Sequence, residues 1–188
     1  MHRVSRRHVI ATLTSSTVLL CPAILNAQSV QLDWDNVPTD TPLGQNQLIE
    51  VAAGPATVEI SALAPGEVAV IARPTEDPEY SATGMIQYIA VHHRTEAQIA
   101  FGAANDRDGT VQDPAYFVVN LVCSHRGKAI GLTGNPDAPF ACTDRGSRHS
   151  SVFDASGFGV SGASEDEYLS VPDYTISANG SDVVLTLT

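Results

Sequence analysis

The sequence predicts an all-β protein with one short helix. Three observations favour this fold class: apolar runs are short, turn-forming residues separate them, and no long segment has the 3.6-residue period of an amphipathic helix. The chain has 188 residues, without an internal repeat or a linker-like segment that would divide it. It therefore has the length and pattern of one domain that follows a targeting segment.

The expected strands are rich in β-branched and aromatic residues, which suit a pleated, half-buried surface. In chain order they are residues 48–51, 57–60, 68–73, 85–94 and 115–122, followed by short strands within 151–162, 168–177 and 182–188. Gly54-Pro55 and Pro65-Gly66 are turn signals between the first three strands. Residues 76–84 are expected to form a loop.

One segment predicts a helix. Thr95 is a suitable N-cap for a short helix over residues 96–104, because its hydroxyl can accept a hydrogen bond from the first helical turn. His92 and His93 lie on the strand expected before it, where adjacent side chains point to opposite faces. A metal ion shared by these two histidines is therefore disfavoured, and a structural role is expected for both.

The N-terminus predicts an export signal of the twin-arginine type, over residues 1–27. Arg6 and Arg7 precede a moderately apolar run that ends near Ala27. Several hydroxylated residues dilute this run below the composition of a membrane span, which needs about 20 apolar residues. We expect cleavage and a periplasmic domain over residues 28–188. A retained N-terminal anchor, and with it contact with a membrane, is the alternative.

The chain is strongly acidic, with a formal net charge of −11 at pH 7 from 10 basic and 21 acidic residues. Three of the basic residues lie in the expected signal, which leaves seven against 21 and a charge of −14 for the exported domain. Because phosphate binding needs a basic surface, the charge argues against nucleic acid as a partner. A protein partner with a basic surface is compatible with it.

Two cysteines lie within a segment suited to bind a metal. Cys123 and His125 form the sequence CSH at the end of an expected apolar strand, and Cys142 opens CTDRGS. Thiolate and imidazole groups are ligands for zinc and iron. A disulfide between Cys123 and Cys142 fits an exported protein equally well. The sequence between them, residues 131–140, is expected to be a flexible span.

The pattern Cys-x-His, sixteen intervening residues, and then Cys-x-x-x-Gly-Ser resembles the motif of the Rieske iron-sulfur family. The segments IAVHHRTEAQI, AYFVVNLVCSHRG and LSVPDYTIS are similar to the iron-sulfur subunit of ubiquinol-cytochrome c reductase. The resemblance extends from about Val58 to the C-terminus. It implies a Rieske-type antiparallel β-sheet sandwich with a small cluster-binding subdomain, whose ligand loops would lie at about residues 118–160.

In this family two cysteines bind one iron of a 2Fe-2S cluster and two histidines bind the other. The resemblance assigns Cys123 and Cys142 as thiolate ligands and His125 as one imidazole ligand. The second imidazole would fall at the position of Arg145, whose guanidinium has no lone pair to donate. Ser147 matches the serine that donates a hydrogen bond towards a cluster sulfide.

Other positions depart from the family pattern together. Lys128 and Asp144 stand where the respiratory branch usually has a disulfide between its ligand loops, and His149 replaces a tyrosine. The sequence SGAS at 161–164 replaces a turn that contains Gly-Pro. Because Arg145 replaces the second imidazole, only His125 could bind a quinol directly, which disfavours quinol oxidation within a standard respiratory complex.

Three hypotheses follow for the site. In the first, the two cysteines and His125 hold a 2Fe-2S cluster with a fourth ligand from His149, Asp144 or a deprotonated Arg145. In the second, the site binds zinc tetrahedrally. The four zinc ligands would be Cys123, His125, Cys142 and His149. In the third, the cysteines are free or disulfide-bonded, and the domain is a clusterless structural or docking module in the periplasm.

The sequence thus predicts an exported Rieske-type iron-sulfur protein that acts in electron transfer. It would be a soluble carrier or a subunit of a respiratory-type oxidoreductase, and its partner a redox protein or the other subunits of such a complex. The zinc-binding or clusterless module is the alternative.

Overall fold

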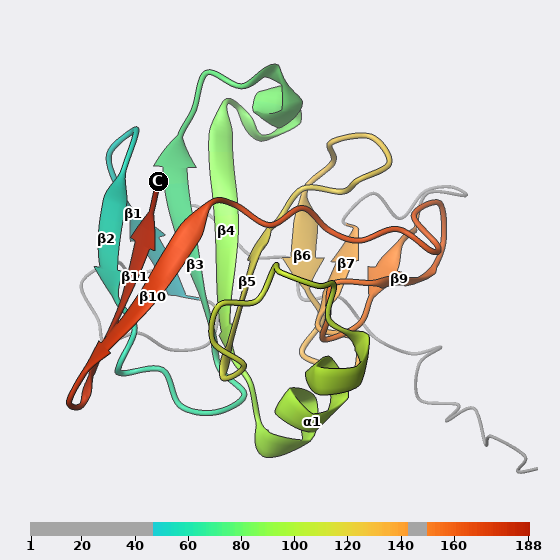
Figure 1. Cartoon of the computed structure of the whole chain (residues 1–188). Coiled ribbons are helices and arrows are strands. Elements are labelled where there is room, and N and C mark those ends of the chain that lie inside the picture. Colours follow the sequence, from blue (N-terminus) through green and yellow to red (C-terminus); the bar gives the residue numbers. More distant parts are fainter. Residues whose placement is uncertain (1–46, 143–149) are drawn as a thin grey trace, which may run out of the picture.

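The computed structural model describes residues 47–142 and 150–188, which form β-strands with one α-helix and one short 3-10 helix (Figure 1). In chain order the elements are β1 (Gln47–Glu50), β2 (Ala56–Glu59), β3 (Val68–Pro74), the 3-10 helix η2 (Pro78–Thr83), β4 (Ile86–His93), α1 (Glu96–Asn105), β5 (Tyr116–Asn120), β6 (Ile130–Leu132), β7 (Phe140–Cys142), β8 (Val152–Phe153), β9 (Gly159–Ser161), β10 (Tyr174–Asn179) and β11 (Asp182–Leu187). The prediction of an all-β fold with one short helix is confirmed. The export signal expected at residues 1–27 lies outside the described residues.

The strands of the described residues form three sheets, with the orders β1-β3-β4-β5, β10-β11-β2 and β6-β7-β8-β9. Neighbouring strands run antiparallel except β1 and β3, which are parallel. The antiparallel arrangement that the resemblance implied is thus present in every other strand pair of the described residues, and β1-β3 is the exception. β2 lies between β1 and β3 in the sequence but pairs with β11 in another sheet. The chain thus crosses over and re-enters the first sheet in the direction of β1.

The sheet β1-β3-β4-β5 is buried on both faces. Val68 and Val70 of β3 belong to a core that includes residues of β6, β7 and β8, whereas Ala69 and Ile71 belong to a core shared with β2 and β11. In Figure 1, β2, β10 and β11 accordingly lie on one side of β3 and β4, and β6, β7 and β9 lie on the other. Burial on two faces explains why β3 and β5 have continuous apolar sequences.

Helix α1 begins at a capping box. The Thr95 hydroxyl accepts a hydrogen bond from the Gln98 backbone N–H at 3.3 Å, and the Gln98 side-chain oxygen accepts one from the Thr95 N–H at 2.9 Å. The predicted cap is confirmed. The helix ends at Asn105, one residue beyond the predicted boundary.

Residues 76–84 were expected to be a loop, and the structure has the 3-10 helix η2 there. Asp77 caps the start of η2 by accepting a hydrogen bond from the Glu79 N–H at 2.9 Å. Gly84 ends it in the left-handed region at φ 71°, which glycine adopts without steric cost. The two end residues, rather than an apolar pattern, define this helix.

The span 131–140, expected to be flexible, forms the turn and the adjoining strand ends of a β-hairpin between β6 and β7. Leu132 is opposite Phe140, and the Thr133 N–H donates to the Pro139 carbonyl at 2.9 Å. The Thr133 hydroxyl also donates to the Ala138 carbonyl inside the turn. The two strands have only three residues each, and the turn-forming residues between them prevented their prediction from the sequence.

Among the residues described, no helix combines the length and the apolar composition required to cross a membrane.

Candidate metal centre

Cys123 stands at the start of a tight loop, residues 123–128, that follows β5. Val122 forms an isolated bridge with Ala129. Within the loop, the Cys123 N–H donates to the Lys128 carbonyl at 2.7 Å, and the Gly127 N–H donates to the Cys123 carbonyl at 2.9 Å. Gly127 has a left-handed φ of 62°. The loop is therefore stabilised by its own backbone hydrogen bonds, and glycine at position 127 adopts the left-handed conformation without steric cost.

Cys142 is the last residue of β7. Its N–H donates to the Ser151 carbonyl at 2.8 Å, and its Cα is opposite that of Ile130 in β6. Cys142 and Ser151 are therefore neighbours in the sheet. Ile130 in turn donates its N–H to the Leu121 carbonyl at 3.0 Å, which joins the β6-β7 hairpin to the strand that leads into Cys123.

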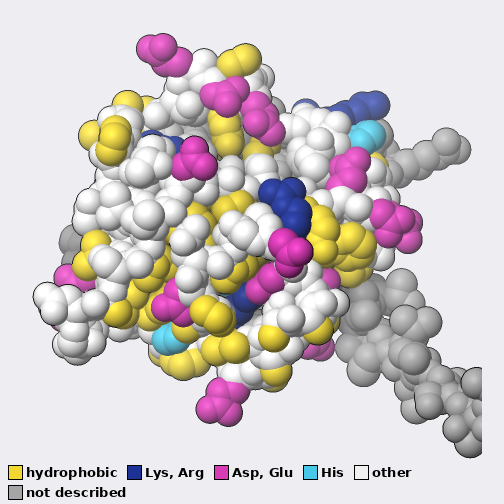
Figure 2. Space-filling view, viewed as in Figure 1, with side chains coloured by type: hydrophobic (Ala, Val, Ile, Leu, Met, Phe, Trp, Pro, Cys, Tyr) yellow, Lys and Arg dark blue, Asp and Glu magenta, His cyan; other side chains and the backbone are white. Residues whose placement is uncertain are grey.

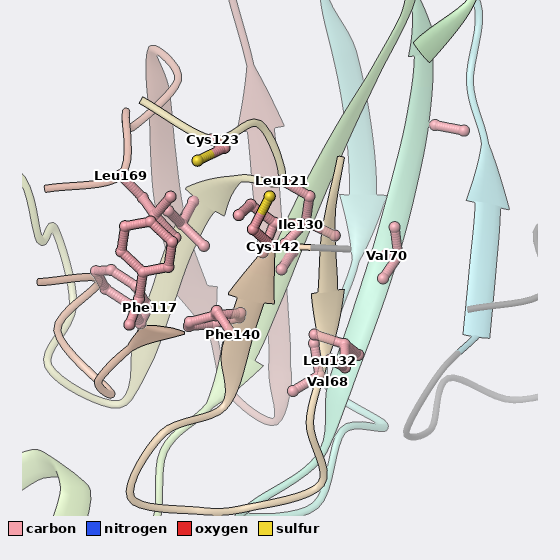
Figure 3. Close-up of a cluster of buried hydrophobic side chains, with 14 of the residues drawn as sticks. Val68, Val70, Phe117, Leu121, Cys123, Ile130, Leu132, Phe140, Cys142 and Leu169 are labelled. Atoms are coloured by element: carbon pink, nitrogen blue, oxygen red, sulfur yellow. The ribbon is translucent and has the colours of Figure 1, made fainter. Parts of the chain in front are cut away.

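These connections place the two thiols side by side. Figure 3 shows both sulfur atoms at one end of the apolar cluster, with Cys123 on the loop after β5 and Cys142 at the end of β7. Each cysteine is 3% exposed and is present as a thiol, not in a disulfide. The side chain of Cys142 is hydrogen-bonded to that of Cys123.

The sulfur of Cys123 is surrounded by hydrogen-bond donors, and they lower its pKa to about 5. The largest contribution is the hydrogen bond with Cys142, and further bonds come from the Ser164 hydroxyl, the His125 backbone N–H and the Ser151 hydroxyl. Burial acts in the opposite direction but is outweighed. The site therefore favours a thiolate, which is the form of cysteine that binds metals.

His125, the third predicted ligand in the described residues, has an exposed side chain. Its backbone N–H is the part that bonds to Cys123. Within residues 47–142 and 150–188, no three His, Cys, Asp or Glu side chains are grouped so that they could hold a metal ion. The structure thus brings Cys123 and Cys142 together but does not complete a site around them with the His125 imidazole.

The other predicted site residues, Arg145, Ser147 and His149, lie outside the described residues, as does Asp144. Lys128, the expected partner of Asp144 across the ligand loops, is exposed. Its backbone carbonyl supports the Cys123 loop, as described above.

Ser164 is a site residue that the sequence did not reveal. Its side chain is fully buried, and its Oγ lies 3.4 Å from the Cys123 sulfur. Its backbone N–H donates to the Ser151 Oγ at 3.0 Å. Ser164 lies 41 positions after Cys123, so only the folded chain relates the two. In the sequence, this loop was indicated only by SGAS at 161–164, which departs from the Gly-Pro turn of the family that the chain resembles.

The Ser164 loop packs so closely that two of its neighbours must be glycine. A Cβ on Gly159 would collide with the backbone carbonyl of Ser164. A Cβ on Gly162 would collide with the carbonyl of Ser150, and Gly162 has a left-handed φ of 87°. The backbone of this loop therefore lies directly against Ser150 and Ser151.

His92 and His93 behave as the strand pattern predicts. His92 is buried and makes an edge contact with Phe140, whereas a ring nitrogen of His93 is 2.6 Å from the Leu63 carbonyl and the ring stacks on Tyr116. Burial, followed by repulsion from Arg94 and His93, lowers the pKa of His92 to about 4. The two histidines belong to opposite faces of β4, and the structural role expected for them fits this arrangement.

No family model and no curated protein matches this chain. The function must therefore be inferred from the chemistry of the thiol pair and its surroundings.

The described part of the site fits one half of a 2Fe-2S cluster. Two adjacent buried sulfur atoms suit a single iron, because thiolates are the ligands that such clusters use. The O–H and N–H groups around Cys123 are donors that stabilise sulfur carrying negative charge. His125 follows Cys123 by two residues and is exposed, so the described residues supply the two sulfur atoms of the site but not an imidazole beside them.

Proposed function

We propose that the protein is an exported Rieske-type iron-sulfur protein that transfers electrons. The observation that carries the proposal is the pair of buried thiols, Cys123 and Cys142, with hydrogen-bond donors directed at the Cys123 sulfur. An isolated structural cysteine buried in apolar surroundings would have its pKa raised, whereas that of Cys123 is lowered. The environment therefore favours a bound, negatively charged sulfur.

In this proposal Cys123 and Cys142 hold one iron, and His125 binds the other. The fourth ligand is His149, Asp144 or a deprotonated Arg145, and a bound cluster supplies a centre that accepts and releases one electron. The core around the thiols excludes water from the sulfur atoms. Ser147 is proposed to donate a further hydrogen bond towards the cluster.

The architecture is compatible with a Rieske-type sandwich. The sheets β1-β3-β4-β5 and β10-β11-β2 would be its base, and the sheet β6-β7-β8-β9 with its loops would be the small cluster-binding subdomain. The two cysteines lie at the junction of the first and third sheets, because Cys123 follows β5 and Cys142 ends β7. An exposed His125 at this junction would let a partner approach the cluster within electron-transfer distance.

The partner is proposed to be a redox protein with a basic surface. Acidic side chains are spread over the face in Figure 2, and basic ones are fewer there. Complementary charge accelerates the encounter of transient redox partners and makes it sensitive to salt. The proposed site of action is the periplasm, as a soluble carrier or as a subunit of a respiratory-type oxidoreductase.

Metal and sulfide analysis tests this function. The exported protein, purified from iron-replete cells, is expected to be coloured, to contain about two iron atoms and two labile sulfides, and to give a paramagnetic signal when reduced. Cys142→Ser should abolish all three properties. A colourless protein that takes up neither iron nor sulfide during anaerobic reconstitution would rule out electron transfer through a cluster.

A second candidate function follows from the described residues, because they contain no complete group of metal ligands. Zinc bound by Cys123, His125, Cys142 and His149 would require the His125 imidazole to join the two thiols, whereas a metal-free module that docks to a periplasmic protein would agree with this finding. Equimolar zinc in place of iron would establish the first of these. A stable partner complex that survives Cys123→Ser would establish the second.

A further inference from the structure

Ser164 is fixed in position by contacts on both sides of its peptide backbone. Its N–H donates to the Ser151 Oγ at 3.0 Å, and its carbonyl accepts from the Glu167 N–H at 3.1 Å. The backbone around it is closely packed, because a Cβ on Gly159 would collide with the Ser164 carbonyl and a Cβ on Gly162 with the Ser150 carbonyl. The side chain of Ser164 has therefore little freedom apart from rotation of its hydroxyl.

The direction of the contact between Ser164 and Cys123 depends on the state of the sulfur. In the thiol form either the S–H or the O–H can donate across the 3.4 Å that separate the two atoms. A sulfur bound to iron has lost its proton, so it can only accept. Metal binding would thus fix the Ser164 hydroxyl as a donor to Cys123.

Ser151 makes a second contact of the same kind. It is fully buried, its oxygen accepts the N–H of Ser164, and its side chain is hydrogen-bonded to Cys123. A hydroxyl can accept and donate at once, so both bonds are compatible with one orientation of the O–H group. Two serines from segments separated in the sequence therefore direct hydroxyl groups at one sulfur.

We propose that Ser164 and Ser151 are positioning residues that raise the reduction potential of a cluster bound at Cys123 by donating O–H···S hydrogen bonds to its sulfur. This inference rests on the proposed function. The physical reason is that a hydrogen bond to a ligand sulfur withdraws negative charge, and the reduced cluster carries more of that charge than the oxidised one. The bonds consequently stabilise the reduced state more than the oxidised state.

The test compares Ser164→Ala and Ser151→Ala with the wild-type protein, with Ser156→Ala as a matched control. Ser156 is also a buried serine of the same region, but its hydroxyl has no hydrogen-bond partner among the described residues. Iron and sulfide contents are measured first, and the midpoint potential is then measured for each protein that holds a cluster. Removal of a hydroxyl from Ser156 reproduces the loss of a buried oxygen without the loss of a bond to sulfur.

Each of the two variants is expected to lower the reduced-to-oxidised ratio by about tenfold at a given ambient potential, which corresponds to about 59 mV for one electron. Ser156→Ala should retain the wild-type ratio. Pulsed electron paramagnetic resonance in deuterated buffer should also detect fewer exchangeable deuterons near the cluster in Ser164→Ala. A merely structural role of Ser164 would change stability without changing the potential.

The outcomes distinguish failure of the proposed electron-transfer function from failure of the role proposed for Ser164 and Ser151. If the wild-type protein binds no cluster, the proposed function is refuted, and so is the role of Ser164. A cluster whose potential is the same in wild type and Ser164→Ala leaves electron transfer in place and overturns the role of Ser164. If Ser164→Ala fails to hold a cluster, Ser151→Ala decides, and an unchanged potential in that variant overturns the inference.

Discussion

Arg94 and Asp106 form a bidentate ion pair at the two ends of α1. The guanidinium donates two hydrogen bonds to the carboxylate, with N···O distances of 2.7 and 2.6 Å. The Arg94 side chain is completely buried, lies over the Phe117 ring and donates a third bond to the Ala155 carbonyl at 3.0 Å. One charged group thus connects the helix, β5 and the loop after β8.

Replacement of Asp106 should destabilise the protein strongly. Asp106→Ala leaves the Arg94 charge buried without its counterion, and removal of one member of a buried pair typically costs about 3 to 5 kcal/mol. Because Asp106 is partly exposed, we expect the lower end of this range. Urea unfolding measures the loss. Asp108→Ala, at an exposed position two residues away, is the control, and equal losses in both variants would contradict the role of the pair.

Gly102→Ala should destabilise the protein although alanine favours helices. A Cβ on Gly102 would lie 2.6 Å from Arg94 Nη1 and 2.7 Å from Asp106 Oδ2, closer than such contacts allow. Overpacking of this kind costs about 1 to 3 kcal/mol, against a gain of about 1 kcal/mol in helix propensity. The expected result is a lower free energy of unfolding in urea. An increase of about 1 kcal/mol would mean that propensity decides and that the ion pair can shift freely.

The elements predicted correctly from the sequence are those that local signals define. The Thr95 cap and the apolar strands β3, β4 and β5 depend on nearby residues, so their positions could be inferred without the fold. The β6-β7 hairpin could not, because each strand has three residues and turn signals dominate the span between them. The parallel pairing of β1 and β3 was also hidden, since it arises from the path of β2 in another sheet.

The residues of the candidate site also fall into those that the sequence indicates and those that only the fold brings together. Cys123, Cys142 and His125 were recognisable as a set of residue types at a suggestive spacing. Ser164 was not, because its contact with Cys123 depends on how the loop after β9 folds back over the site. Gly159 is informative only once the loop is in place, since the sequence alone does not indicate which glycines face a backbone carbonyl.

The stability of the protein should fall in mild acid because of His92. Burial lowers its pKa from 6.5 to about 4, so the unfolded state binds more protons than the folded state between these two values. The free energy of unfolding therefore decreases as the pH falls through this window, by about 2 kcal/mol between about pH 7 and pH 5. Urea unfolding at both pH values measures the change, and His92→Leu should reduce it by that amount. A variant with the same pH dependence as wild type would assign the effect to other groups.

Gly162→Ala should be more damaging than the same change at an exposed glycine. Both Gly162 and Gly180 have a left-handed φ, but a Cβ at Gly162 meets the Ser150 carbonyl whereas a Cβ at Gly180 meets no atom within 4 Å. The left-handed backbone alone costs about 1 to 2 kcal/mol, and the collision adds about 1 to 3 kcal/mol. Thermal or urea unfolding of the two variants gives the difference. Equal losses would show that the loop relaxes at no cost, and the fixed position of Ser164 would then be wrong.

The fourth cluster ligand should be identifiable by single substitutions in residues 143–149. If a cluster is bound, His149→Ala, Asp144→Ala and Arg145→Ala each test one candidate, and Arg148→Ala controls for the loss of a long side chain in the same segment. The variant that removes the ligand should lose most of its iron or change the paramagnetic spectrum, since an iron that exchanges nitrogen for oxygen or solvent alters its electronic state. Arg145→His should increase cluster occupancy and raise the potential, because a neutral imidazole stabilises the reduced state better than an anionic ligand does. Unchanged spectra in all three alanine variants would refute the set of candidates and point to a ligand from elsewhere in the chain or from a partner.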